Sequence, residues 1–223
     1  MTLEDTYRHK GLRRQLIDAL RIKGINNENV LDAMNLLPRH FFLESAFEEL
    51  AYSDKAFPID NEQTISQPYT VAYMTHLLDV RKKQKILEIG TGSGYQAALL
   101  GILGARVYTV ERQEILFKKA KELLKKLDLH SVKCFFGDGS IGLPNFEPYD
   151  RIIVTAGIDT IIPDELKQQL AIGGIMVSPV GNGLVQKMYK IIRHDTDSFE
   201  EIVTDTFRFV PFLKGVNKIN IGQ

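Results

Sequence analysis

The sequence contains one cysteine and no tryptophan among its 223 residues. Cys134 cannot form a disulfide within the chain, and its apolar surroundings, VKCFF, predict a buried strand residue. The five histidines are scattered without a typical ligand spacing. We therefore expect neither a disulfide nor a metal site.

Net charge and long apolar runs are also missing. The 28 basic and 28 acidic side chains leave no formal net charge, so the basic surface of a general nucleic-acid binder is absent. No apolar run approaches the roughly 20 residues of a membrane span, and the N-terminus lacks the apolar core of a signal peptide. These absences predict a cytoplasmic protein that binds neither nucleic acid nor membranes. The oligomeric state stays open, with a monomer favoured.

The region after residue 80 alternates short apolar strands with helical segments. Such alternation predicts a doubly wound, mostly parallel, Rossmann-like α/β sheet. Two further strands follow without a helix between them, which predicts an antiparallel C-terminal edge. The expected strands span residues 85–90, 105–111, 132–138, 149–156, 173–181, 187–195 and 200–212, and the expected helices span residues 96–103, 114–127 and 164–170.

The first 80 residues read as a helical elaboration on this core. Apolar residues recur at spacings of three and four up to Pro38, which predicts two short helices. A third helix is expected over Pro68–Leu78, with Ser66 as its N-cap. We expect one domain over residues 1–223, in which residues 1–80 form the elaboration and lid and residues 81–223 form the core.

A glycine-rich loop, EIGTGSGY, follows the first strand of the core. Gly90, Gly92 and Gly94 fall where a strand must turn sharply and a ligand can approach the backbone. Glu88 lies beside the loop, where a carboxylate could serve an amine-bearing or cationic ligand. A tight turn with no ligand remains an alternative for the loop alone.

Two further acids lie at the ends of the next strands. Glu111 ends the second strand, where a carboxylate can accept hydrogen bonds from ribose hydroxyls. Asp138, followed by Gly139, ends the third strand and could reach an adenine amine. The glycines run GxGxG, not GxGxxG, and no second nucleotide-binding half follows. These features favour S-adenosylmethionine over NAD.

Several segments resemble the protein-L-isoaspartate O-methyltransferase family. They are QTISQPYTVAYM, LEIGTGSGYQAALL, TVER, GDG, DRIIVTAGIDTIIPDELKQQLAIGGIMVSPVG and RFVPFLKG. The resemblance extends over about Leu31 to Gly215, and TISQP is its specific part, because many methyltransferases share the glycine-rich loop.

The resemblance implies a class I methyltransferase that uses S-adenosyl-L-methionine to esterify the free carboxyl of L-isoaspartyl residues in damaged proteins and peptides. The ester then closes to a succinimide, which initiates repair. The resemblance implies catalytic roles for Thr64 and Ser66. It agrees with cofactor-binding roles for Glu88, Gly90, Gly92, Gly94, Glu111, Asp138 and Gly139. The substrate-binding positions that it implies are Ile65, Gln67, Val154, Thr155, Ala156 and Val210.

Two departures from the family pattern, Gly157 and Lys214, lie on the expected substrate side. The residues alone leave three alternatives: a methyltransferase for another carboxylate or small molecule, a non-catalytic sensor of adenosine ligands, and a nicotinamide-dependent oxidoreductase. They also leave open whether Ser66 is catalytic, a helix cap or both.

Overall fold

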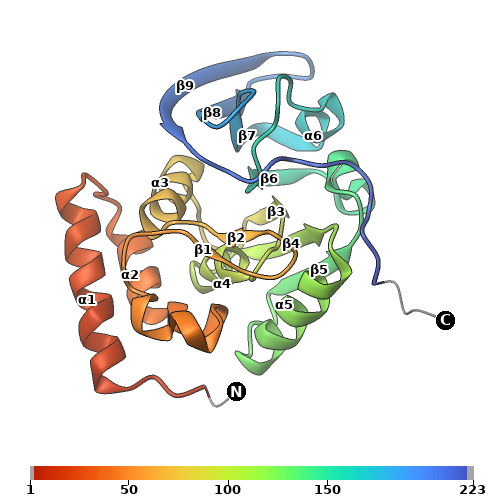
Figure 1. The fold of residues 1–223 in the computed structure, drawn as a ribbon. Helices are drawn as coiled ribbons and strands as arrows, with labels where there is room; N and C mark the ends of the chain where they lie inside the picture. The colour runs from red at the N-terminus through yellow and green to blue at the C-terminus, as the bar shows by residue number, and fades with distance from the viewer. Residues whose placement is uncertain (1–2, 220–223) are drawn as a thin grey trace.

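The computed structural model describes residues 3–219. Its main feature is a seven-stranded sheet in the order β5-β4-β3-β6-β7-β8-β9 (Figure 1). The strands are β3 (Lys85–Ile89), β4 (Arg106–Glu111), β5 (Val132–Phe136), β6 (Tyr149–Val154), β7 (Leu170–Val180), β8 (Gln186–Arg193) and β9 (Phe199–Phe207). The predicted fold class is confirmed, since β3 to β7 pair in parallel and β8 and β9 are antiparallel.

Helices cover both faces of this sheet. Ile86 and Ile153 belong to a buried cluster that includes side chains of the helices before and after β3, whereas their neighbours Leu87 and Ile152 pack on the opposite face with Leu166. This alternation is expected of central strands, because successive side chains point to opposite faces and both faces are buried. The helices of the core are α4 (Tyr95–Ile102), α5 (Glu114–Lys126) and α6 (Asp164–Gln168).

The carboxyl ends of β3, β4 and β6 lie side by side. Ile89 pairs with Val110 on one side and with Val154 on the other. The loops that follow these three strands therefore meet at one edge of the sheet, the usual position of ligand sites in open α/β folds.

The N-terminal region packs as helices against the core (Figure 1). Leu20 and Leu31 share one buried cluster with Leu99 of α4, so this region extends the hydrophobic core. A two-stranded ribbon follows and then a third helix, which confirms the three predicted helices. These elements are α1 (Tyr7–Ile22), α2 (Glu28–Leu36), η1 (Arg39–Phe42), η2 (Ser45–Leu50), β1 (Phe57–Pro58), β2 (Thr64–Ile65) and α3 (Pro68–Leu78).

The prediction that Ser66 caps α3 is wrong. Gln67 occupies the N-cap position and makes no side-chain capping bond. Pro68 has no N–H to satisfy, and the next free donor, the Tyr69 backbone N–H, donates to Asp54 Oδ1 at 2.8 Å. A carboxylate from an earlier segment thus caps the helix and leaves the Ser66 hydroxyl available.

None of the helices found between residues 3 and 219 combines the length and apolar character needed to cross a bilayer.

Candidate active site

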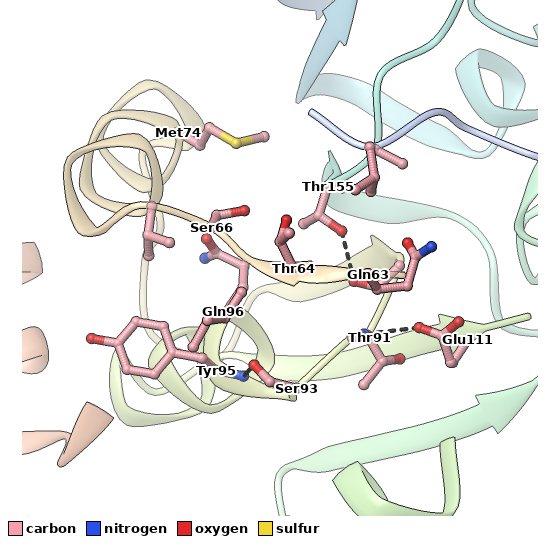
Figure 2. A pocket seen from close by; sticks show the side chains of 16 residues that line it. Gln63, Thr64, Ser66, Met74, Thr91, Ser93, Tyr95, Gln96, Glu111 and Thr155 are labelled. Carbon is pink, nitrogen blue, oxygen red and sulfur yellow. Dashed lines mark hydrogen bonds between the residues drawn. The ribbon is translucent and has the colours of Figure 1, made fainter. Parts of the chain in front are cut away.

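A cavity of about 70 Å³ lies between the ribbon β1–β2 and the carboxyl ends of β3 and β6. A larger groove of about 590 Å³ adjoins it and shares Thr64, Ser66, Thr155 and Val210 with it. The residues that line the cavity are Gln63, Thr64, Ile65, Ser66, Val71, Met74, Gly90, Thr91, Gly92, Ser93, Tyr95, Gln96, Glu111, Thr155, Ala156 and Val210 (Figure 2).

The glycine-rich loop forms the floor of the cavity. Gly90 and Gly92 have φ angles of 95° and 53°, in the left-handed region that favours glycine. A Cβ atom on Gly90 would clash with the Thr155 hydroxyl, which donates to the Gly90 carbonyl oxygen at 2.6 Å. Gly94, also left-handed, occupies the N-cap position of α4 without lining the cavity. The loop therefore brings bare backbone to the cavity, as a ligand cradle requires.

Glu111 lies at the carboxyl end of β4 and faces the cavity. Its Oε2 accepts from the Gly92 N–H at 2.8 Å and its Oε1 accepts from the Gln113 N–H at 2.9 Å. Burial raises the pKa of this carboxyl, and the backbone N–H groups of Gly92 and Gln113 oppose that rise. Each oxygen retains a lone pair, so the side chain can accept two more hydrogen bonds in a fixed orientation.

Thr64 and Ser66 approach from the opposite side. Both belong to the segment that runs from β2 into α3, and Figure 2 shows their hydroxyls around the same space as Thr155. Within residues 3–219, neither hydroxyl takes part in a hydrogen bond, whereas the Thr155 hydroxyl donates to the carbonyl oxygens of Ile89 and Gly90. Two free hydroxyls thus face the backbone cradle.

Glu88 lies apart from the cavity, although the sequence places it beside the loop. Its side chain is fully buried in β3, and neither carboxylate oxygen has a partner among the described residues. Burial raises the pKa of Glu88 to about 8. A protonated acid therefore sits behind the loop at neutral pH.

Asp138 is bonded to the C-terminal segment. Its Oδ1 accepts from the Ser140 N–H at 2.8 Å and its Oδ2 accepts from the Gly215 N–H at 2.6 Å. Burial opposes ionisation, but these N–H groups lower the pKa of Asp138. Gly139 is buried against Ile89, with no room for a Cβ atom. Neither residue lines the cavity; both lie at the end of β5, beyond Glu111.

The comparisons with known proteins agree with one another. Residues 11–217 match the family model described as Protein-L-isoaspartate(D-aspartate) O-methyltransferase (PCMT). The chain belongs to this family. The match begins earlier than the start near Leu31 that the sequence motifs indicated, so most of α1 and all of α2 are part of the family's shared region.

The matches to individual relatives extend over most of this chain. A protein-L-isoaspartate O-methyltransferase from Flavobacterium johnsoniae is 55% identical over 215 residues, which cover 96% of this chain and 100% of the relative. A solved protein-L-isoaspartate O-methyltransferase is 28% identical with a TM-score of 0.80 over 89% of this chain, and the match spans 65% of that longer chain.

A second solved structure shares the fold at lower identity. It is a Plasmodium falciparum chain described as a protein-L-isoaspartate O-methyltransferase in complex with S-adenosyl-L-homocysteine. It is 22% identical with a TM-score of 0.80, and the match covers 93% of this chain and 99% of that chain. The mostly parallel sheet with its antiparallel C-terminal edge is therefore the family's methyltransferase fold.

The substrate positions implied by the family occupy different surroundings in this member. Ile65, Ala156 and Val210 line the cavity, while Gln67 lines the adjoining groove and donates to Asp54 Oδ2 at 3.0 Å. Val154 is fully buried in β6 and reaches neither surface. Gly157 bonds to Val210 and Phe212 through its backbone, which holds the C-terminal segment beside β6.

Several cavity residues were missed by sequence reasoning. Gln96 lies in the first turn of α4, and Met74 lies on α3; each looks like an ordinary core position in a helix. Tyr95 also lines the cavity, and the sequence leaves open whether it covers the cofactor or fills the core. Thr91 and Gln63 also line the cavity. The only local signal was their position next to the glycine loop or to TISQP.

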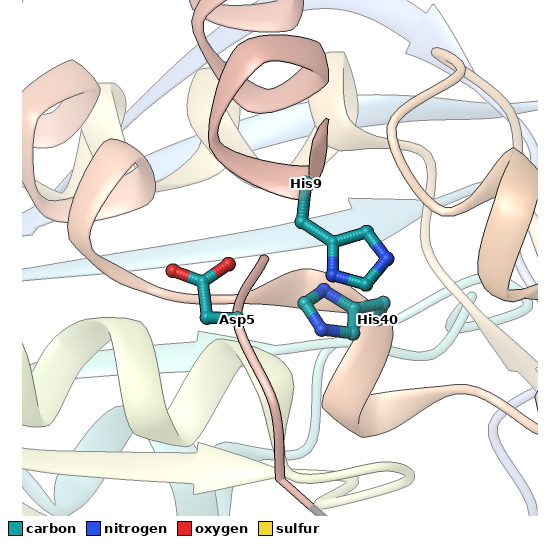
Figure 3. Close-up of side chains that lie close together, drawn as sticks. All are labelled: Asp5, His9 and His40. Carbon is teal, nitrogen blue, oxygen red and sulfur yellow. The ribbon is translucent and has the colours of Figure 1, made fainter. Parts of the chain in front are cut away.

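Three side chains in the N-terminal region resemble a metal site by position alone. Ligand atoms of Asp5, His9 and His40 lie within 4.8 Å of one another (Figure 3). Asp5, however, accepts two hydrogen bonds from Arg13 at 2.9 Å, and His40 bonds to the Tyr52 hydroxyl at 2.7 Å. Because these atoms already have partners, the group acts as a packing network that joins α1 to η1.

Proposed function

We propose that this chain transfers a methyl group from S-adenosyl-L-methionine to the free carboxyl of L-isoaspartyl residues in damaged proteins and peptides, as its family name describes. The observation that best supports this proposal is the cavity itself. In it the hydroxyls of Thr64 and Ser66, which have no partner within residues 3–219, face the glycine backbone and the oriented carboxylate of Glu111. The neighbouring backbone nitrogen attacks the ester and releases methanol, and water then opens the resulting succinimide partly to normal aspartate.

The residues present fit the cofactor. A side chain at Gly90 would collide with Thr155, so the loop keeps backbone exposed where a ligand must approach closely. Glu111 is held by two N–H groups and can accept from a ribose diol. The backbone of Gly90 and Gly92 would cradle the amino-acid end, and Gly94 would hold the end of the loop at the N-cap of α4. When bound, S-adenosyl-L-methionine supplies a sulfonium-activated methyl group.

The carboxylate acceptor needs no strong base. Its reference pKa near 4 leaves it ionised at neutral pH, so the oxygen that forms the new O–CH₃ bond already carries the electron pair. The chain must instead orient this oxygen and remove water from it. Thr64 and Ser66 can donate weak, neutral hydrogen bonds to the acceptor.

Neutral donors suit the direction in which charge changes. Negative charge on the acceptor falls as the O–CH₃ bond forms, so a lysine or arginine on the same oxygen would favour the starting state over the transition state. In the part of the chain that the structure describes, no lysine or arginine lines the cavity. This composition supports Ser66 and Thr64 as the catalytic residues.

The adjoining groove offers a path for an extended polypeptide. Gln67, Phe209 and Val210 line it, next to the end of β9. Contacts to backbone groups along such a path would tolerate many flanking sequences. We further propose that residues 1–223 act as one methyltransferase domain in the cytoplasm, with isoaspartyl proteins and peptides as partners.

The test is transfer of labelled methyl to one synthetic peptide made in two forms, with isoaspartate or with aspartate at the same position. We expect base-labile label on the isoaspartyl form alone. Equal labelling of both forms, or labelling of neither while the cofactor binds, would contradict the proposed acceptor and favour another carboxylate or a sensor.

A further inference from the structure

Arg39 is a fully buried arginine that the proposed reaction does not use directly. It opens η1, and its Nη2 donates to the Ser66 carbonyl oxygen at 2.8 Å. Its guanidinium carbon lies 5.0 Å from the centre of the Tyr95 ring, within range of a cation–π contact. Arg39 therefore touches two residues of the cavity wall from behind.

The charge of Arg39 is not paired. Its Nε and Nη1 have no hydrogen-bond partner among the described residues. Asp54, a nearby carboxylate, is already bonded to Lys23, Gln67 and the Tyr69 N–H. Burial lowers the pKa of Arg39 to about 10, so the group stays cationic at neutral pH.

Two other buried arginines of the chain have hydrogen-bond partners for their guanidinium groups. Arg13 forms a two-bond pair with Asp5, and Arg151 donates to the carbonyl oxygens of Leu78, Asp79 and Asp150. An unpaired buried charge is strongly unfavourable, so we expect it to have a role that compensates for this cost. Only Arg39 of these three lies against the cavity wall.

We infer that Arg39 is a positioning residue for the acceptor. Its hydrogen bond fixes the main chain of Ser66, and its stacking fixes the Tyr95 ring. Its unpaired charge also attracts the incoming carboxylate from behind this wall, without contact with the reacting oxygen. The inference rests on the proposed function, because it assigns the acceptor an anionic group.

The charge has opposite consequences for the two ligands of the reaction. It should favour the anionic peptide and disfavour the sulfonium cofactor relative to its neutral product, S-adenosylhomocysteine. A purely structural residue would weaken both cofactor forms alike. The ratio of their dissociation constants therefore separates the two roles.

The experiment compares Arg39→Met and Arg39→Lys with a matched control, Arg151→Met, which removes a buried arginine that lines neither the cavity nor the groove. We would measure kcat, the KM for the isoaspartyl peptide, Kd values for both cofactor forms by calorimetry, and the melting temperature. All assays would run at one temperature at which every variant is folded.

For Arg39→Met we expect a peptide KM about tenfold higher, a kcat about tenfold lower, and a Kd ratio shifted about threefold towards S-adenosylmethionine. Arg39→Lys keeps the charge and should restore the peptide KM and the ratio but not kcat. Arg151→Met should lose thermal stability with kinetic constants within twofold of wild type.

An unchanged Kd ratio in Arg39→Met, or kinetic losses equal to those of Arg151→Met, would overturn the inference. Failure of the wild type to methylate the isoaspartyl peptide would instead count against the proposed function. In that case the Kd ratio alone decides whether the charge acts on the cavity: a shift supports that action, and no shift refutes it.

Discussion

The two ends of the site are built from different chemistry. At the proposed nucleoside end, the carboxylates of Glu111 and Asp138 are each held by two backbone N–H groups. At the proposed acceptor end, Thr64 and Ser66 offer neutral hydroxyls that have no partner within residues 3–219. One end is lined by fixed carboxylates, and the other is lined by neutral hydroxyls that are free to turn.

The difference teaches how one fold can bind two ligands with separate demands. A carboxylate fixed by N–H groups recognises hydroxyls at little entropic cost, because its orientation is set before binding. An open hydroxyl can turn towards an acceptor whose charge falls during the reaction. Substitutions at the two ends should therefore separate cofactor affinity from turnover.

The largest effect is expected at Glu111. Glu111→Ala removes two charge-assisted hydrogen bonds to the ribose, each worth about 1.5–3 kcal/mol, so the cofactor Kd should rise at least about 100-fold. Calorimetry would measure it, with the exposed Glu122→Ala as control. A rise in the cofactor Kd of less than threefold would contradict the assignment of Glu111 to the ribose.

Ser66 should affect turnover instead. Ser66→Ala should lower kcat about 30-fold, since one donor to the reacting group is lost, while the cofactor Kd stays within twofold. The melting temperature should not change, because Asp54 and not Ser66 caps α3. Steady-state kinetics beside Ser53→Ala would check this; a normal kcat with a lower melting temperature would contradict both statements.

Substitution of Glu88 would test whether a third carboxylate binds the cofactor beside Glu111 and Asp138. Its pKa is raised from 4.5 to about 8, so the folded protein binds more protons than the unfolded chain between these values. Stability should therefore fall as pH rises through this window, by roughly 5 kcal/mol over its whole width.

Glu88→Gln should abolish that pH dependence and leave the cofactor Kd within threefold at pH 7. Melting curves from pH 6 to pH 9 would measure the first effect. A melting temperature of the wild type that does not change with pH would show that Glu88 is not the buried acid described above. A cofactor Kd that is tenfold higher in Glu88→Gln would indicate that Glu88 belongs to the cofactor site.

Asp138 should give the smallest effect. Asp138→Asn can keep the acceptor for one N–H group but loses the charge, so the cofactor Kd should rise about threefold to fivefold. The exposed Asp197→Asn serves as control in the same calorimetric titration. No change would indicate that Asp138 only ties down the C-terminal segment through Gly215.

Much of the fold could be predicted from the sequence, because the parallel strands are buried on both faces. Ile152, Ile153 and Val154 form an unbroken apolar run that few other structures would tolerate. The nearness of Gly90 to Glu111 also followed from the topology, since adjacent parallel strands end together.

The remainder depends on contacts between distant segments. Asp54 caps α3 from 15 positions away, and Asp138 meets Gly215 across 77 positions. Arg39 sits in PRHFF, where nothing local shows that the guanidinium is buried behind Ser66. Such pairings are set by tertiary packing, which local patterns do not encode.

The last strand of the sheet has a consequence for a protein that acts on damaged proteins and peptides. β9 is an outer strand with one unpaired side, and most of its side chains are exposed, including Glu200, Glu201 and Asp205. Free strand edges recruit other extended polypeptides, and charged side chains counter this tendency. The row of carboxylates on β9 thus disfavours aggregation with the damaged polypeptides that the groove beside it would receive.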